Sequence, residues 1–99
     1  MAAPLRLSAL FYDYVEGMAE LRAPHREGHL KLIEDFAADG RLAIAGAVGD
    51  PPHAGLLVFA DDAAAEAFVA ADPYVEAGLV SERRIEPWNV VAHRPLAGS

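Results

Sequence analysis

The sequence predicts an α+β fold of the ferredoxin-like type, in which a four-stranded antiparallel sheet carries its helices on one face. Segments with strand patterns and segments with helix periodicity follow one another in the order βαββαβ. Two such halves in one small chain most often form this arrangement. The length of 99 residues allows one hydrophobic core. We therefore expect a single domain over 1–99, with its core at about 5–92 and a loose tail at 93–99.

The first strand is predicted for residues 5–14, LRLSALFYDY, where odd- and even-numbered side chains alternate between the two faces. Apolar residues occur in both sets, so we expect one face to be covered and the other to be covered in part. The next segment, VEGMAELRA, should form a short helical turn that breaks near Pro24. Proline suits the first turn of a helix better than its interior.

The main helix is predicted from about Pro24 to Asp39, because Gly40 readily takes the left-handed conformation that ends helices. Gly28 lies inside it at a cost of about 1 kcal/mol relative to alanine. Close approach of a substrate or of backbone would explain this glycine, and so would drift. The apolar stripe has two neighbouring lines of side chains: Leu30, Ile33 and Ala37, and His29, Leu32 and Phe36. A histidine thus stands where an apolar residue would serve.

The second half of the chain contains two strands, a helix and a last strand. The two strands are predicted at 41–48 and 56–60, joined by a turn rich in glycine and proline. The helix at 61–71 opens with aspartates that suit its N-terminus and stops before Pro73, with an extra turn expected at 75–79. The last strand is predicted for 80–93, where Pro87 indicates an edge position or a bulge.

Composition excludes several classes of protein. The 15 acidic and 8 basic residues give a net charge of -7, which disfavours nucleic acid and anionic membranes as partners. Cysteine is missing, which excludes disulfide scaffolds, thiolate metal sites and cysteine nucleophiles. The segment MAAPLRLSAL lacks the pattern of a signal peptide, and no run approaches the roughly 18 apolar residues of a membrane span. We expect a cytoplasmic protein with no nucleic-acid or membrane partner.

A sheet with helices on one face leaves its other face uncovered. Hydrophobic residues make up 54% of the chain, so this open face is most simply buried against a second copy. We therefore expect a homodimer packed sheet to sheet, as in a dimeric α+β barrel.

Metal and cofactor motifs are weak or missing in the sequence. His25 and His29 are one helical turn apart, a spacing that can place two imidazoles on one metal. However, no glutamate follows His25 as in H-E-x-x-H, and His53 and His93 fall in a loop and near the tail. The nucleophile elbow, the P-loop and the dinucleotide-binding glycine motif do not occur. We expect neither a metal nor a cofactor.

Three segments occurring in order, REGHLKLIEDFAADGRLAIAG, DPYVEAGL and IEPWNVV, resemble the YciI-like (YCII-related) proteins, which are small dimeric α+β barrel proteins. The resemblance extends from about Leu5 to Val91. In that family a histidine and an aspartate face one another in a pocket as an acid-base pair. The resemblance implies His29 and Asp72 for this pair, and Arg26 for the arginine that precedes the histidine.

The segment RAPH, residues 22–25, has the same spacing of arginine and histidine and could be mistaken for the motif. The later pair matches better, because His29 is followed by leucine and lies at the family's distance from the GRL segment at 40–42. His25 is followed instead by Arg26. The sequence also has R-E-G-H-L where the family usually has R-P-A-H-L.

The chemistry of such a pair is proton transfer. A carboxylate on one ring nitrogen of histidine fixes the tautomer and leaves the other nitrogen to take or give a proton. Periodicity alone also fits a buried His29 bonded to a carbonyl, and an Asp72 that only ends a helix. Tyr74 can donate its hydroxyl to the same pocket or serve as a packing aromatic. Trp88 fits the sheet core or a dimer interface.

Two functional classes follow from these residues. The first is a cofactor-independent enzyme, a lyase or isomerase, that transfers a proton on a small organic molecule, including a dehalogenating elimination on an aromatic degradation product. His29 and Asp72 would be catalytic, with Arg26 and Tyr74 binding the substrate. The second is a non-catalytic module that binds a metabolite or docks on another protein. The sequence identifies no particular substrate.

Overall fold

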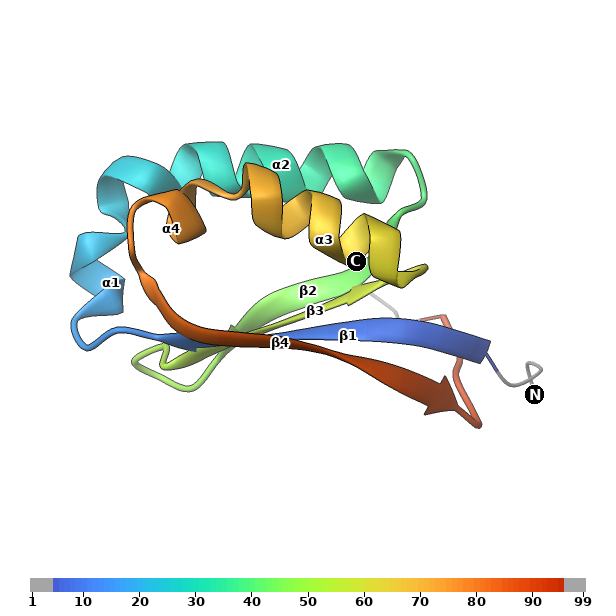
Figure 1. Ribbon diagram of the computed structural model, residues 1–99. Helices are drawn as coiled ribbons and strands as arrows, with labels where there is room; N and C mark the ends of the chain where they lie inside the picture. Colours follow the sequence, from blue (N-terminus) through green and yellow to red (C-terminus); the bar gives the residue numbers. More distant parts are fainter. Residues whose placement is uncertain (1–4, 96–99) are drawn as a thin grey trace.

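A computed structural model describes residues 5–95 of the protein (Figure 1). Its elements in chain order are β1 (Leu5–Tyr14), α1 (Met18–Leu21), the 3-10 turn η1 (Ala23–His25), α2 (Arg26–Ala38), β2 (Leu42–Val48), β3 (Ala54–Phe59), α3 (Asp62–Ala71), α4 (Pro73–Glu76) and β4 (Val80–Val90). The order of the long elements confirms the predicted βαββαβ arrangement.

The four strands form one antiparallel sheet in the order β2-β3-β1-β4. The central strand β1 places Leu10 opposite Leu57 of β3 and Ile85 of β4. Helix α2 packs on β2, and α3 packs over β1 and β3. Figure 1 shows both helices on the same face of the sheet. The predicted ferredoxin-like α+β fold is therefore confirmed.

Some element bounds differ from the prediction. Strand β3 begins at Ala54, because its pairing with β1 and β2 continues to that residue. The extra helical turn begins at Pro73 instead of at residue 75, since the Asp72 side chain accepts a hydrogen bond from the backbone N–H of Tyr74 and caps it. Strand β4 ends at Val90, opposite the start of β1 at Leu5, and not at residue 93.

Pro87 lies in β4, which is an edge strand, opposite Ser8. The edge position predicted for this proline is correct, whereas the irregularity in the β1–β4 register lies elsewhere, between Asp13 and Tyr14. Residues 91–95 have no regular secondary structure. The rest of the predicted tail, 96–99, lies outside the described residues.

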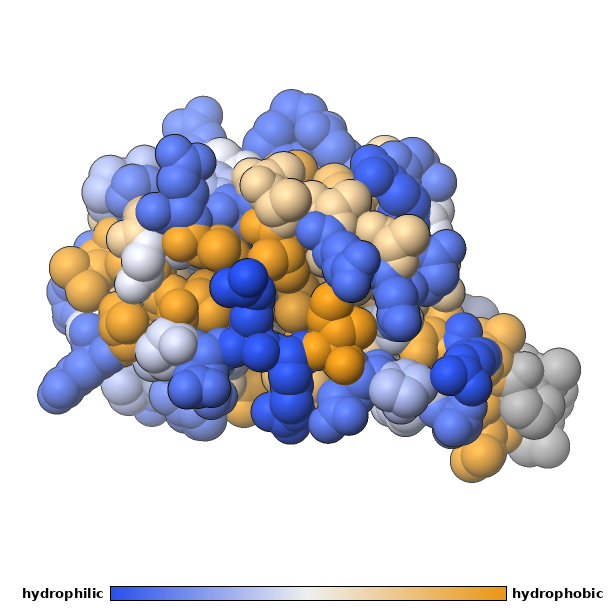
Figure 2. All heavy atoms as spheres, viewed as in Figure 1, coloured by the Kyte–Doolittle hydropathy of each residue, from blue (hydrophilic) through white to orange (hydrophobic). Residues whose placement is uncertain are grey.

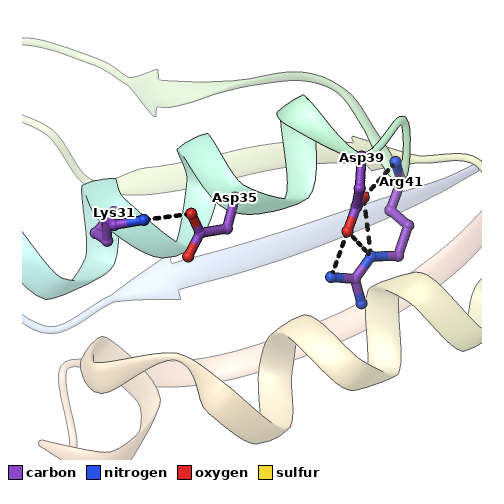
Figure 3. A network of polar contacts seen from close by, with 4 residues as sticks. All are labelled: Lys31, Asp35, Asp39 and Arg41. Carbon is purple, nitrogen blue, oxygen red and sulfur yellow. Dashed lines mark hydrogen bonds and ion pairs between the residues drawn. The ribbon is translucent and has the colours of Figure 1, made fainter.

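The core lies between the helices and the sheet, where Figure 2 shows apolar side chains between two more hydrophilic outer layers. Its centre is aromatic: the rings of Phe36 and Phe68 meet edge to face at 5.3 Å. The guanidinium of Arg41 lies 3.6 Å from the ring centroid of Phe36 and pairs with Asp39 at 2.7 Å. Figure 3 shows this pair just after the end of α2 and the Lys31–Asp35 pair along the helix. The Arg41 contact thus closes the core where α2 ends.

The buried side of α2 differs in part from the predicted stripe. His29 and Phe36 are buried and Leu32 is partly buried, as the second predicted line requires. In the first line, Leu30 is 44% exposed and Ala37 is also exposed. The helix is rotated so that the histidine line faces the core.

No helix within residues 5–95 covers the other face of the sheet, and the segment 92–95 lies beside part of it. Large apolar side chains of three strands stand exposed on it: Leu5, Ile44, Val48 and Trp88. Trp88 is 46% exposed, so it is not packed in the core of this chain. None of the helices in the described range is long and apolar enough to cross a bilayer.

Candidate functional site

A cavity of about 200 Å³ lies between the first half of α2 and strand β2. Two of its lining residues, Arg22 after α1 and Tyr74 in α4, belong to the end of the molecule that is on the left in Figure 1. Arg26, His29 and Tyr74 line it, so the structure brings three of the sequence-predicted site residues to one cavity. Asp72, the fourth, lies behind His29.

His29 and Asp72 are in direct contact, with Nδ1 of the histidine 2.8 Å from Oδ1 of the aspartate. Both side chains are buried, at 6% and 1% exposure. Asp72 stands where α3 stops and α4 starts, because Pro73 cannot continue the first helix. The junction therefore holds the carboxylate against the histidine face of α2.

Three donors surround the Asp72 carboxylate: His29 Nδ1, the backbone N–H of Tyr74 at 3.0 Å and the Tyr12 hydroxyl at 2.9 Å. An ionised carboxylate has only acceptors and can receive all of them. This arrangement makes Nδ1 of His29 the protonated nitrogen of the neutral ring. Nε2, which makes no hydrogen bond within residues 5–95, is then the nitrogen that can accept a proton from a molecule in the cavity.

The imidazole plane is also fixed by aromatic packing. The Tyr74 ring stacks on it, with centroids 3.7 Å apart and planes at 8°. The Phe68 ring meets it edge to face at 6.0 Å. Because packing and the carboxylate both restrain the ring, His29 has one orientation toward the cavity.

Tyr74 is only 2% exposed, and its hydroxyl is buried without a hydrogen-bond partner in the described part of the chain. Burial raises the pKa of Tyr74, and the positive charges of Arg22 and Arg26 act against that rise. Arg26 thus approaches the hydroxyl without completing a hydrogen bond of good geometry. At neutral pH the group is a phenol that can still donate its proton.

The two tyrosines of β1 are also neutral groups. Burial raises the pKa of Tyr12 far above its ordinary value, and the charge of Asp72 and its hydrogen bond add to the rise. Burial raises the pKa of Tyr14 to about 12, with further contributions from Tyr74 and Asp72. Tyr12 therefore stays protonated at neutral pH and donates its hydroxyl proton to the Asp72 carboxylate.

Gly28 lets α2 approach the α3–α4 junction. A Cβ atom at this position would lie 3.3 Å from Cγ of Pro73, closer than ordinary van der Waals contact. Close approach therefore accounts for this glycine, although the neighbour is a proline ring and not a substrate or backbone. The close packing of Gly28 against Pro73 helps to bring His29, the residue after Gly28, next to Asp72, the residue before Pro73.

Two residues of the site were missed at the sequence level. Arg22 belongs to the RAPH segment, which matches the family motif less well, yet it lines the same cavity as Arg26. The spacing of one helical turn between the two arginines was the available signal. Tyr12 shares the even-numbered face of β1 with Leu10, but the sequence could not tell that this face meets the helices.

A metal centre is not assembled among residues 5–95, since no three potential ligands of the histidine, cysteine or carboxylate type gather there. The nitrogen of His29 that lies against Asp72 is already in a hydrogen bond.

Comparisons with known proteins identify the fold. The family model of the YCII-related domain matches residues 7–89. The solved structure of 5-chloro-2-hydroxyhydroquinone dehydrochlorinase from Burkholderia phenoliruptrix, in complex with 2,5-dihydroxybenzoquinone, is similar with a TM-score of 0.69 and 21% identity, covering 83% of this chain and 92% of that one. A protein of unknown function from Nitrosomonas europaea is similar with a TM-score of 0.59 and 22% identity, covering 96% and 97%. No curated protein sequence matches this chain significantly.

Proposed function

The chain belongs to the YCII-related domain family, and from this premise we propose that it is a cofactor-independent enzyme that transfers a proton on a small organic molecule. His29 is the acid-base group and Asp72 its orienting partner. The observation that carries the proposal is the 2.8 Å contact between the two side chains beside a cavity that His29 lines. Arg26 and Tyr74, on the same cavity, bind the substrate.

The contacts support a general-base step at Nε2. This nitrogen takes a proton from a carbon or hydroxyl of the substrate, and the positive charge that forms on the imidazole is stabilised by the adjacent carboxylate. In a dehalogenating elimination on a chlorinated hydroquinone, a hydroxyl loses its proton while the ring carbon that bears chlorine gains one, which gives a keto tautomer. A second hydroxyl then loses its proton, and its electron pair forms a new carbonyl and shifts the ring double bond as the carbon–chlorine bond breaks. Chloride leaves, and the histidine passes its proton to water, so the substrate loses HCl overall.

Among lyase and isomerase chemistries, we favour the dehalogenating elimination. A dehydrochlorinase has the same fold, and its complex with a quinone identifies a chemical class to test first. The cavity of about 200 Å³ is small, as a single-ring substrate requires.

The test is release of chloride from 5-chloro-2-hydroxyhydroquinone under anaerobic conditions. We expect release above the uncatalysed rate, lowered at least about 100-fold by His29→Gln, because general acid-base groups contribute roughly that much or more. Asp72→Asn should lower it as well. His25→Gln, which changes a histidine one turn away, should leave the rate unchanged.

Binding of this compound without chloride release would favour the alternative, a non-catalytic metabolite-binding module. Equal rates for wild type and His29→Gln would contradict the proposed role of the histidine.

We also propose that two copies pack through the open faces of their sheets. The exposed Leu5, Ile44, Val48 and Trp88 support this, because an apolar sheet face of this kind is costly to leave in water.

A further inference from the structure

The ionisable side chains that line the cavity include no carboxylate. They are Tyr14, Arg22, Arg26, His29 and Tyr74. The whole chain is acidic, with a net charge of -7. At the cavity, however, the two guanidinium groups of Arg22 and Arg26 outnumber the Asp72 carboxylate that lies behind His29, so the region is net positive. Such a region favours an anion over a neutral or cationic ligand.

The two arginines are not neutralised by neighbours in the described part of the chain. The ion pairs of lysine and arginine there join Lys31 to Asp35, Arg41 to Asp39 and Arg84 to Glu86, and none of them includes Arg22 or Arg26. Arg22 follows α1 and Arg26 begins α2, so the turn between these helices brings both to the cavity. Their planar guanidinium groups have donors suited to oxyanions.

The unpartnered hydroxyl of Tyr74 is a second, independent observation. A buried polar group without a partner is rare in native proteins. The guanidinium groups near this hydroxyl have donors only, and its best complement is an acceptor that all of them can share. An oxygen anion is such an acceptor.

The remaining wall of the cavity is apolar, formed by Leu30, Ile33, Ala45, Ala47 and Leu57. This wall fits the body of a small ring and offers it no charged partner. The stacked rings of His29 and Tyr74 add flat aromatic surface to the lining of the same cavity. The charged end and the apolar wall together define an amphipathic ligand.

We propose that the cavity binds a small organic anion with a flat apolar body, whose negatively charged oxygen lies between Arg22, Arg26 and the Tyr74 hydroxyl. Arg22 is then a specificity-determining residue of the site. The inference rests on the proposed function for the role of His29, whose Nε2 faces the body of the bound anion. An anion held by two cations is also well placed to lose a further proton, because the arginines stabilise the charge that develops.

The experiment measures binding of three one-ring probes to the full chain at pH 7 and low salt, by NMR shift titration: benzoate, neutral benzamide and cationic benzylammonium. We expect benzoate to bind at least about tenfold more tightly than benzamide, the factor that one charge-assisted hydrogen bond supplies. Benzylammonium should bind least.

Variants assign the selectivity to residues. Arg22→Gln and Tyr74→Phe should each weaken benzoate binding about tenfold and weaken benzamide binding less, because the neutral carbonyl oxygen is the weaker acceptor. Arg22→Lys should recover part of the loss, because it keeps the charge without the planar fork. Arg6→Gln, which removes an equal charge from an exposed position of β1, should bind benzoate like wild type.

Equal affinities for benzoate and benzamide, or no benzoate binding at millimolar concentration, would overturn the anion site. The same holds if Arg6→Gln weakens benzoate as much as Arg22→Gln does. The two proposals can fail separately. Selective benzoate binding without chloride release would contradict the proposed enzyme function but support the anion site. Chloride release without selective benzoate binding would contradict the anion site alone.

Discussion

Tyr12 donates its hydroxyl to Oδ2 of Asp72 at 2.9 Å, and this bond joins the central strand of the sheet to the junction between α3 and α4. The other carboxylate oxygen receives His29 and the backbone of Tyr74. The sheet as well as the helices therefore fixes the positions of His29 and Asp72. Support from both layers keeps the two side chains in one geometry.

Replacing Tyr12 by phenylalanine should lower the free energy of unfolding by about 1–3 kcal/mol, because it leaves a buried carboxylate oxygen without its donor. Urea denaturation measures the change. Tyr14→Phe is the matched control, since the Tyr14 hydroxyl makes no side-chain hydrogen bond within residues 5–95 and its loss should cost less. Equal costs for the two variants would contradict the stated role of the Tyr12 bond.

Replacing Asp72 by asparagine should lower the proton affinity of His29, because the amide keeps an acceptor for Nδ1 but removes the negative charge that stabilises the imidazolium. NMR chemical shifts of the His29 ring, followed against pH in wild type and variant, measure this difference. Asp35→Asn removes an exposed carboxylate from the same helix as His29 and should not move it. A titration of His29 that is unchanged in Asp72→Asn would show that the contact has no electrostatic consequence.

A methyl group at Gly55 should destabilise the protein, because its Cβ would lie 2.5 Å from the Tyr14 hydroxyl and 3.0 Å from Cζ of that ring. We expect Gly55→Ala to cost about 1–3 kcal/mol, the usual range for overpacking. In a Tyr14→Phe background the closest atom is gone and the cost should fall, which a double-mutant cycle in urea measures. An unchanged cost in that background would place the strain elsewhere.

The stability of the protein should decline as the pH rises from 10 to 12. The pKa of Tyr14 is raised from 10.0 to about 12 in the folded protein, so across this window the folded state holds a proton that the unfolded state has lost. The favourable contribution is therefore complete below pH 10 and disappears as the pH passes through the folded value. Urea midpoints at several alkaline pH values should fall less steeply in Tyr14→Phe than in wild type. Parallel slopes would contradict this assignment.

The protein should have twice the 10.5 kDa mass of one chain in light scattering, if the open sheet faces pair as proposed. Ile44, which is 52% exposed on that face, should be essential for pairing, and Ile44→Glu should give a monomer because it would bury a charge in the interface. Leu21→Glu changes an exposed leucine of α1 away from the sheet and should leave the dimer intact. A monomeric wild-type chain would reject the proposal.

The order and type of the elements could be predicted because they depend on local patterns. Alternation along residues 5–14 and helix periodicity with a terminal glycine at Gly40 are encoded in neighbouring residues. Both are present in the structure with small changes at the ends. The rotation of α2 that buries His29 and exposes Leu30 could not be predicted, since both lines of the stripe are apolar enough to face a core.

By itself, the sequence determined the order of strands and helices. Its resemblance to the YCII-related proteins implied His29, Asp72 and Arg26 as site residues, with Tyr74 beside Asp72, because the spacing of motifs is a property of the chain. Only the tertiary structure decided that Tyr12, 60 positions from Asp72, completes the carboxylate's donors, and that Arg22 shares the cavity with Arg26. Contacts at such separation depend on strand register and on which faces pack together. These are fixed by burial of the whole core and not by any local pattern.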